Sequence, residues 1–224
     1  NGLPYSRHKV ARMISRLASG VIVLHKPVSE YVSLTPYQLV AHRGFQQRFP
    51  ENTGLAVSEA IKAGALFVEI DIQLSQDLHP VVYHDISLER VSGCEGSITA
   101  LTLEQLKQLP AYEPERLGDR FIENSVSSLQ EVVEILQQHP AVTLFVELKE
   151  QSIEHFGGAT VLSKVCEVLE SIKQRAVLIS FDYETMQRAR DVGWPQVGMV
   201  LRDWIDIDSP QFSALAGEYT FVNH

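Results

Sequence analysis

The chain has 224 residues, of which 45% are hydrophobic and 21% are charged, and its formal net charge is −9. This is ordinary globular composition with enough length for a sizeable core, so we expect one α/β domain or two small domains. The acidic balance argues against a general nucleic-acid partner. The two cysteines provide no disulfide framework, which is compatible with a reducing compartment, and we expect a cytoplasmic protein.

Residues 1–38 precede the predicted domain and are expected to form a separate, helical segment. Basic side chains between residues 7 and 26 surround an apolar run at 21–24, which is far too short to span a bilayer. The segment also lacks the small-residue cleavage site of a signal peptide. The simpler interpretation is an amphipathic helix that docks on the domain. The alternative is a basic segment that contacts a membrane surface peripherally.

From residue 39 onward, apolar runs of strand length alternate with segments of helical pattern. Such alternation predicts parallel βα units, arranged either as a doubly wound sheet or as a (β/α)₈ barrel. The stretch 86–125 is longer than a βα loop needs, so we interpret it as an insertion. The predicted strands are 39–43, 66–72, 80–84, 142–148, 176–181, 196–201 and 219–223, and the predicted helices are 52–64, 101–109, 126–138, 158–174, 183–191 and 209–216.

Carboxylates follow one face of two predicted strands. Side chains alternate across a strand with period two, so Glu69 and Asp71 share a face, and Glu147 lies on the corresponding face of its strand. A single Glu-x-Asp is usually surface alternation, but burying three carboxylates together is costly without compensation. Mg²⁺ or Ca²⁺ provides that compensation, since these ions prefer carboxylate oxygens, and no nearby cysteine suggests zinc.

Basic residues occupy the ends of the same set of strands. His42 and Arg43 end the first predicted strand, His84 ends the third, and Lys149 ends the fourth. The carboxyl ends of parallel strands meet at one rim of a barrel, where active sites are built. A lone histidine at a strand end is usually structural. Together, however, Arg43 and Lys149 suit a phosphate, and the two histidines suit acid–base chemistry, so the sequence predicts cleavage of a phosphodiester.

In their order and spacing, these residues resemble the glycerophosphodiester phosphodiesterase family. The resemblance covers residues 39–223. It implies a (β/α)₈ barrel with a small insertion after the third strand. It also implies hydrolysis of glycerophosphodiesters to glycerol 3-phosphate and an alcohol with a divalent metal. The motifs are His42-Arg43-Gly44, Pro50-Glu51-Asn52-Thr53, Glu69-x-Asp71, Pro80-Val81-Val82-x-His84-Asp85, Glu147-x-Lys149 and Ser180-Phe181-Asp182.

The resemblance also implies roles by position. We expect one histidine to remove a proton from the glycerol 2-hydroxyl, which attacks phosphorus, while the other protonates the leaving alcohol. Attack by water is the alternative, and the histidine that starts as the base is left open. Asn52 is interpreted as the N-cap of the first helix or a contact of the metal site, and Glu51 as a partner behind the site. The implied roles are an acid–base pair of His42 and His84, metal ligands Glu69, Asp71 and Glu147, and phosphate-binding residues Arg43 and Lys149.

The family's last strand has no counterpart in this sequence. Residues 221–224 end the chain in a run that we interpret as the seventh strand, so the predicted domain at 39–224 is incomplete at its carboxyl end. An open barrel leaves a strand edge unpaired. We therefore expect the native gene to encode at least one further βα unit, and a protein that ends at His224 to be less active.

Two other functions compete with a glycerophosphodiesterase that acts on a small molecule. The first is lysophospholipase D-type hydrolysis of lipid phosphodiesters, which would need an apolar mouth beside the site. The second is a non-catalytic phosphodiester-binding module, although binding alone needs no acid–base pair. The alcohol group, the preferred metal and the oligomeric state are left open.

Overall fold

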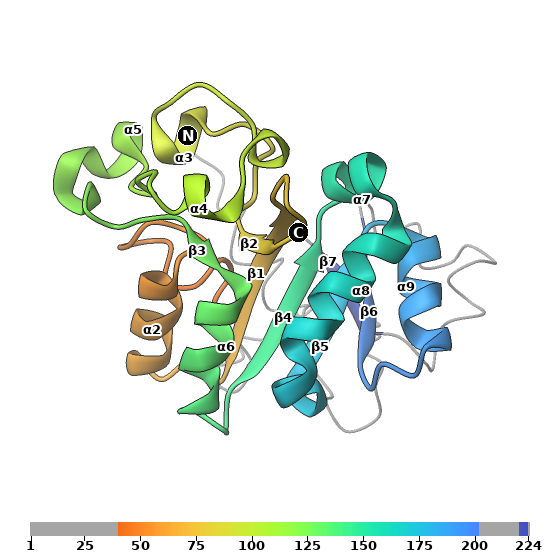
Figure 1. Ribbon diagram of the computed structural model, residues 1–224. Coiled ribbons are helices and arrows are strands. Elements are labelled where there is room, and N and C mark those ends of the chain that lie inside the picture. The colour runs from red at the N-terminus through yellow and green to blue at the C-terminus, as the bar shows by residue number, and fades with distance from the viewer. Residues whose placement is uncertain (1–39, 202–219, 224) are drawn as a thin grey trace, which may run out of the picture.

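The computed structural model describes residues 40–201 and 220–223, with side chains described for 40–200. The predicted N-terminal segment and the predicted helix at 209–216 lie outside these residues. The described strands form a seven-stranded sheet in the order β3-β2-β1-β4-β5-β6-β7 (Figure 1). Their bounds are β1 Phe67–Leu74, β2 Pro80–Val82, β3 Ser127–Ser128, β4 Thr143–Leu148, β5 Ala176–Ser180, β6 Val197–Leu201 and β7 Thr220–Asn223.

The predicted alternation of strands and helices is confirmed for β4, β5 and β6 and the helices between them. Neighbouring strands β1, β4, β5, β6 and β7 are parallel, as connections through helices require. A short helix after β4 was not predicted, because its seven residues are mostly polar. No described helix is both long enough and apolar enough to cross a bilayer. The helices around this part of the sheet are α2 Gly54–Lys62, α6 Leu129–Gln137, the unpredicted α7 Glu150–Phe156, α8 Gly158–Leu169 with the 3₁₀ turn η4 Glu170–Arg175, and α9 Tyr183–Asp191.

Strand β2 lies where the third strand was predicted, but the assumption that it is parallel to its neighbours was wrong. It pairs antiparallel with β1, with Ile72 opposite Val82. Only residues 75–79 connect the two strands, and a connection this short permits a hairpin but not a parallel crossover. The chain therefore turns back at the carboxyl end of β1, and the residues after β2 lie alongside Asp71, whose carbonyl accepts the Tyr83 N–H at 3.0 Å.

The first predicted strand, 39–43, is reduced in the described residues to one parallel bridge between Ala41 and Val68. Two hydrogen bonds secure it: Ala41 N–H donates to the Phe67 carbonyl at 2.9 Å, and Glu69 N–H donates to the Ala41 carbonyl at 3.0 Å. The bridge places His42 and Arg43 immediately beside Glu69.

The insertion after β2 is confirmed and carries more helical turns than the one predicted at 101–109. It gathers at the end of the sheet toward which the arrowheads of β1 and β4 point (Figure 1). A second apolar cluster holds it together, with Tyr83, Leu88, Ile98 and Leu106 buried. Its elements are α3 Glu89–Ser92, η2 Ile98–Ala100, α4 Leu103–Leu106, α5 Pro114–Leu117 and η3 Gly118–Phe121.

The two faces of the parallel sheet differ in chemistry. Residues 68, 70 and 72 of β1 and 144, 146 and 148 of β4 pack against the helices in the main core, as the period-two pattern predicts. On the opposite face, the rings of Phe67 and Phe145 meet edge-on, with their centroids 6.4 Å apart. Further along the same strands, that face carries carboxylates, so an apolar floor lies beneath a charged site. The buried members of the floor are Phe145, Val177, Ile179 and Val200.

Candidate active site

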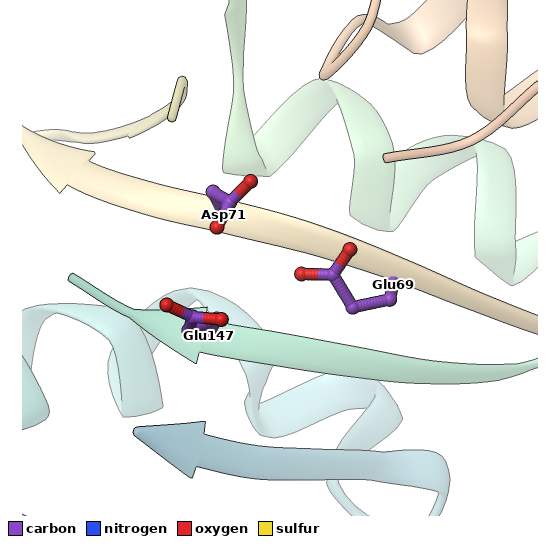
Figure 2. A group of neighbouring side chains, drawn as sticks. All are labelled: Glu69, Asp71 and Glu147. Atoms are coloured by element: carbon purple, nitrogen blue, oxygen red, sulfur yellow. The ribbon is translucent and has the colours of Figure 1, made fainter. Parts of the chain in front are cut away.

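Three carboxylates meet on neighbouring strands, as predicted. Glu69 and Asp71 project from one face of β1, and Glu147 projects from β4 directly beside Asp71 in the strand register (Figure 2). One oxygen from each lies within 4.8 Å of the others, and all three side chains are buried. The arrangement follows from strand alternation and from a parallel register that places both strand ends at one level.

The loop after His42 brings Arg43 into this cluster. Arg43 adopts a left-handed backbone conformation with φ of 55°, which turns its N–H toward Glu69 Oε2 at 3.0 Å. Its guanidinium lies 3.2 Å from Asp71 Oδ2 through Nε and donates to Glu51 Oε1 at 3.0 Å through Nη1. The strained backbone is therefore used to aim both the amide and the side chain at carboxylates.

Asn52 is a contact of the carboxylate site, and its interpretation as a helix cap was wrong. Thr53 caps α2 by accepting the Ala56 N–H at 3.1 Å. The Asn52 side chain instead forms a reciprocal pair with Asp71, donating to Oδ2 at 2.8 Å and accepting the Asp71 N–H at 3.0 Å. Asn52 also has a positive φ of 53°, which residues of this type tolerate better than most. It fixes Asp71 from behind.

Lys149 follows β4 and faces the same carboxylates. Its ammonium donates to Glu147 Oε1 at 2.8 Å and lies 3.2 Å from Asp71 Oδ1. Burial opposes the charge on Lys149, but Asp71 and Glu147 outweigh it and raise the pKa of Lys149. The ammonium therefore stays charged inside the site.

The three carboxylates differ in how well the protein compensates their charge. Burial raises the pKa of Glu69 well above its usual value, and the charges of Asp71 and Glu147 raise it further. Burial also acts on Asp71, but Lys149 and Arg43 outweigh it and lower the pKa of Asp71. The negative charge of Glu69 is therefore compensated less well than that of Asp71.

The chemistry of the donor set fits a hard divalent cation. All three groups offer carboxylate oxygens, which Mg²⁺ and Ca²⁺ prefer, and Glu69 Oε1 is buried without a hydrogen-bond partner among the described residues. Three carboxylates against the charges of Arg43 and Lys149 leave a formal excess of one negative charge. A divalent cation would reverse that excess and would make the site attractive to a phosphodiester anion.

The two histidines flank the carboxylates and are held through different ring nitrogens. His42 Nε2 lies 3.7 Å from Glu69 Oε2, and its Nδ1 contacts the Gln46 amide nitrogen at 3.0 Å. His84 follows the hairpin strand β2, and its Nδ1 lies 2.6 Å from Asp85 Oδ1. The His84 carbonyl accepts a hydrogen bond from the buried Gln73 side chain at 3.0 Å. The two imidazoles therefore come from separate segments, and β2 runs opposite to the direction assumed for the strand before His84.

A network behind the site includes residues that the sequence analysis missed. Glu51 accepts hydrogen bonds from both Arg43 and Arg90, at 3.0 and 2.6 Å. Burial works against ionisation of Glu51, but Arg90 and Arg43 lower its pKa overall. The backbone N–H of Glu51 donates to Glu113 Oε2 at 2.8 Å. Arg90 and Glu113 lie in the irregular insertion, where no strand or helix periodicity marks a residue as facing the site.

Comparison with known proteins identifies the family. The model of the glycerophosphoryl diester phosphodiesterase family matches residues 42–201, which include all the predicted site residues. A glycerophosphodiester phosphodiesterase of Caldanaerobacter subterraneus is 30% identical over 149 residues, which cover 66% of this chain and 60% of that protein. Human glycerophosphodiester phosphodiesterase 1 is 33% identical over 158 residues, covering 68% of this chain and 46% of the human protein. The chain belongs to the glycerophosphoryl diester phosphodiesterase family.

Solved structures confirm the predicted fold class. An Oleispira antarctica phosphodiesterase, solved with the product sn-glycerol 3-phosphate, superposes with a TM-score of 0.66 at 29% identity, over 79% of this chain and 69% of that one. A Thermotoga maritima glycerophosphodiester phosphodiesterase has a TM-score of 0.64 at 25% identity, over 82% of this chain and 72% of that one. The chain spans about 60% of the length of the bacterial relative named above and less than half of the human one.

Proposed function

We propose that this site hydrolyses glycerophosphodiesters to glycerol 3-phosphate and an alcohol in a reaction that depends on a divalent cation. The observation that carries the proposal is the convergence of three buried carboxylates with Arg43 and Lys149, flanked by His42 and His84. Membership of the family supports it, as does the glycerol 3-phosphate bound to the Oleispira relative.

A cation held by Glu69, Asp71 and Glu147 would supply Lewis acidity toward the phosphate and the attacking oxygen. Arg43 suits a non-bridging phosphate oxygen because its guanidinium is planar and permanently charged. Lys149 adds a point charge that stabilises the negative charge gained as phosphorus becomes five-coordinate. Both side chains are held by the carboxylates before substrate arrives, so little reorganisation is needed.

The hydrogen bonds of the two rings suggest which histidine starts in which role. The Gln46 amide nitrogen can only donate, so His42 Nδ1 accepts, and the ring proton of the neutral imidazole lies on Nε2. Asp85 accepts from His84 Nδ1, which leaves the lone pair on His84 Nε2. We therefore assign His84 as the initial base, which removes the proton of the attacking hydroxyl. His42 is assigned as the acid in its imidazolium form, whose Nε2–H protonates the leaving alcohol and leaves the ring neutral, and in that form its Nδ1–H would donate to the Gln46 side-chain oxygen.

The attacking hydroxyl is assigned to the glycerol 2-position, which would give a cyclic phosphate that water then opens with the histidine roles reversed. Direct attack by water is the alternative. Phosphorus NMR of the reaction mixture distinguishes the two, because only the first route forms a cyclic glycerol phosphate.

The test is release of glycerol 3-phosphate from glycerophosphocholine and of lysophosphatidic acid from lysophosphatidylcholine, each with Mg²⁺, with Ca²⁺ and with EDTA. We expect cation-dependent turnover of glycerophosphocholine that is abolished in Glu147→Gln and retained in the matched control Glu134→Gln. Glu134 is an exposed residue of α6, and its side chain accepts a hydrogen bond from Gln130 on the same helix. Turnover that survives exhaustive chelation would contradict the cation requirement. Turnover of the lipid alone would favour the lysophospholipase D alternative.

A further inference from the structure

Arg90 of α3, in the insertion, contacts the groups that hold both ends of the site. We propose that Arg90 is a positioning residue, which aligns His84 through Asp85 and Arg43 through Glu51. The proposal rests on the function proposed above, and it goes beyond it by assigning a role to the insertion.

On one side, Arg90 fixes the carboxylate that orients His84. Its Nε donates to Asp85 Oδ2 at 2.7 Å, and its Nη2 lies 3.1 Å from Oδ1. This is a two-point contact, which fixes the plane of the carboxylate as well as its position. Asp85 Oδ1 is also the atom that meets His84 Nδ1 at 2.6 Å. A rotation of the Asp85 carboxylate would therefore break the hydrogen bond from His84 Nδ1, and the ring proton would no longer be held on that nitrogen.

On the other side, Arg90 fixes the carboxylate that orients Arg43. Glu51 Oε1 accepts from Arg90 Nη2 at 2.6 Å and from Arg43 Nη1 at 3.0 Å, so one buried oxygen joins two guanidinium groups. Arg90 Nη1 also lies 3.5 Å from Glu113 Oε1, and Glu113 accepts the Glu51 N–H. Without Arg90, Arg43 would be the cation that remains beside the Glu51 carboxylate. Glu51 would then compete with Asp71 for the Arg43 guanidinium.

A purely structural role predicts a different outcome from a positioning role. The Arg90 side chain is 40% exposed and that of Asp85 is 26% exposed, and ion pairs at such exposure contribute little to stability. The buried Glu51 carboxylate keeps Arg43 as its partner when Arg90 is removed. The groups that it aligns are buried or half-buried and take part in the proposed chemistry. Its removal should therefore change turnover far more than stability, because small errors in alignment at a reacting centre lower rates strongly.

The experiment compares Arg90→Met and Arg90→Lys with the control Lys107→Met. Lys107 has a similar exposed fraction, 35%, and pairs with Glu131 away from the site. We expect Arg90→Met to lower kcat by about tenfold to a hundredfold, with little change in Tm, and the control to leave both unchanged. Lysine cannot make the two-point contact with Asp85. The decrease in log kcat for Arg90→Lys should therefore be more than half of the decrease for Arg90→Met.

A double-substitution cycle tests the route through Asp85. If Arg90 acts on His84 through that carboxylate, the two substitutions should not add. The kcat of the Asp85→Asn/Arg90→Met protein should then lie within about twofold of the kcat of the slower single variant. Fully additive losses would overturn the proposed route, and a kcat for Arg90→Met within twofold of the wild-type value would overturn the proposal.

A second readout does not depend on activity. Nitrogen NMR of the His84 ring in the otherwise unaltered protein should show the Nδ1–H tautomer, and Arg90→Met should shift the ring toward a mixture. If the wild-type protein hydrolyses no glycerophosphodiester, the proposed function fails, and this measurement still decides the role of Arg90. An unchanged His84 spectrum in Arg90→Met would overturn it.

Discussion

We expect substitution of the two histidines to have different effects, because their ring nitrogens form different hydrogen bonds. His42→Ala and His84→Ala should each lower turnover of glycerophosphocholine by roughly a hundredfold or more. A p-nitrophenyl leaving group needs no protonation, so with such a diester the loss in His42→Ala should largely disappear, while the loss in His84→Ala should persist. Steady-state rates with both substrates check this, and rescue of His84→Ala instead would reverse the assigned roles.

Asn52 combines a positive φ with two buried hydrogen bonds, and two substitutions separate these contributions. Asn52→Ala removes the partners of the Asp71 N–H and carboxylate and also strains the backbone, so it should destabilise by about 2–4 kcal/mol. Asn52→Gly removes the same hydrogen bonds but relieves the strain, and it should recover roughly 1 kcal/mol of that loss. Urea denaturation measures both. Equal stabilities for the two variants would mean that the positive φ costs nothing at this position.

At the scale of elements, Gly44 sets how closely the loop after His42 approaches α2. Its φ is 75°, and a Cβ placed there would lie 2.6 Å from the backbone carbon of Ala56. Gly44→Ala should therefore cost about 2–5 kcal/mol, the sum of a left-handed conformation and a backbone clash. Gly64→Ala is the control, since its φ of 96° is also positive but nothing lies within 4 Å of the added carbon.

The expected cost of Gly64→Ala is only that of the backbone conformation, roughly 1–2 kcal/mol. Denaturation midpoints and activity should both separate the two variants, because the clash at Gly44 also displaces His42 and Arg43. Equal losses of stability would show that the approach of the loop to α2 is not under steric constraint.

Strand periodicity was sufficient to predict the carboxylates of β1 and β4, since alternation directly determines which side chains share a face. The direction of β2 could not be obtained in that way, because an apolar run looks the same in either direction and only the short connection at 75–79 decides it. Asn52 was the only residue considered as the cap of α2, whereas the cap is Thr53, the next residue along the chain. Arg90 was missed because its importance comes from contacts between segments far apart in the sequence. The assignment of residues 1–38 to a separate segment stays a prediction.

At the scale of the whole molecule, the metal-free protein should lose stability as pH rises. The pKa of Glu69 is raised in the folded state by burial and by its two carboxylate neighbours, so the folded state holds this proton at pH values where the unfolded state has lost it. Unfolding then releases a proton, and the free energy of unfolding falls as pH increases above the ordinary carboxylate range. Below that range the penalty is absent.

Glu69→Gln removes this penalty, and we expect its metal-free form to melt above the wild-type protein at pH 8 and level with it near pH 4. Saturating Mg²⁺ or Ca²⁺ should reverse the order at pH 8, because the cation stabilises only the protein that keeps all three carboxylates. Thermal melts with and without EDTA provide the comparison. A wild-type protein that is the more stable of the two in EDTA would contradict the raised pKa.

The separate apolar cluster of the insertion has a consequence for how the molecule opens. The insertion packs around its own buried side chains and joins the sheet through the short strands β2 and β3, with η2 also against β1. Such a unit can exchange its amide hydrogens through partial opening while the large core remains intact. We expect protection of residues 86–125 to be lost at lower denaturant than protection of β1, β4 and β5. Arg90 belongs to the part that opens first, so catalytic competence should disappear at a lower denaturant concentration than amide protection in β1, β4 and β5.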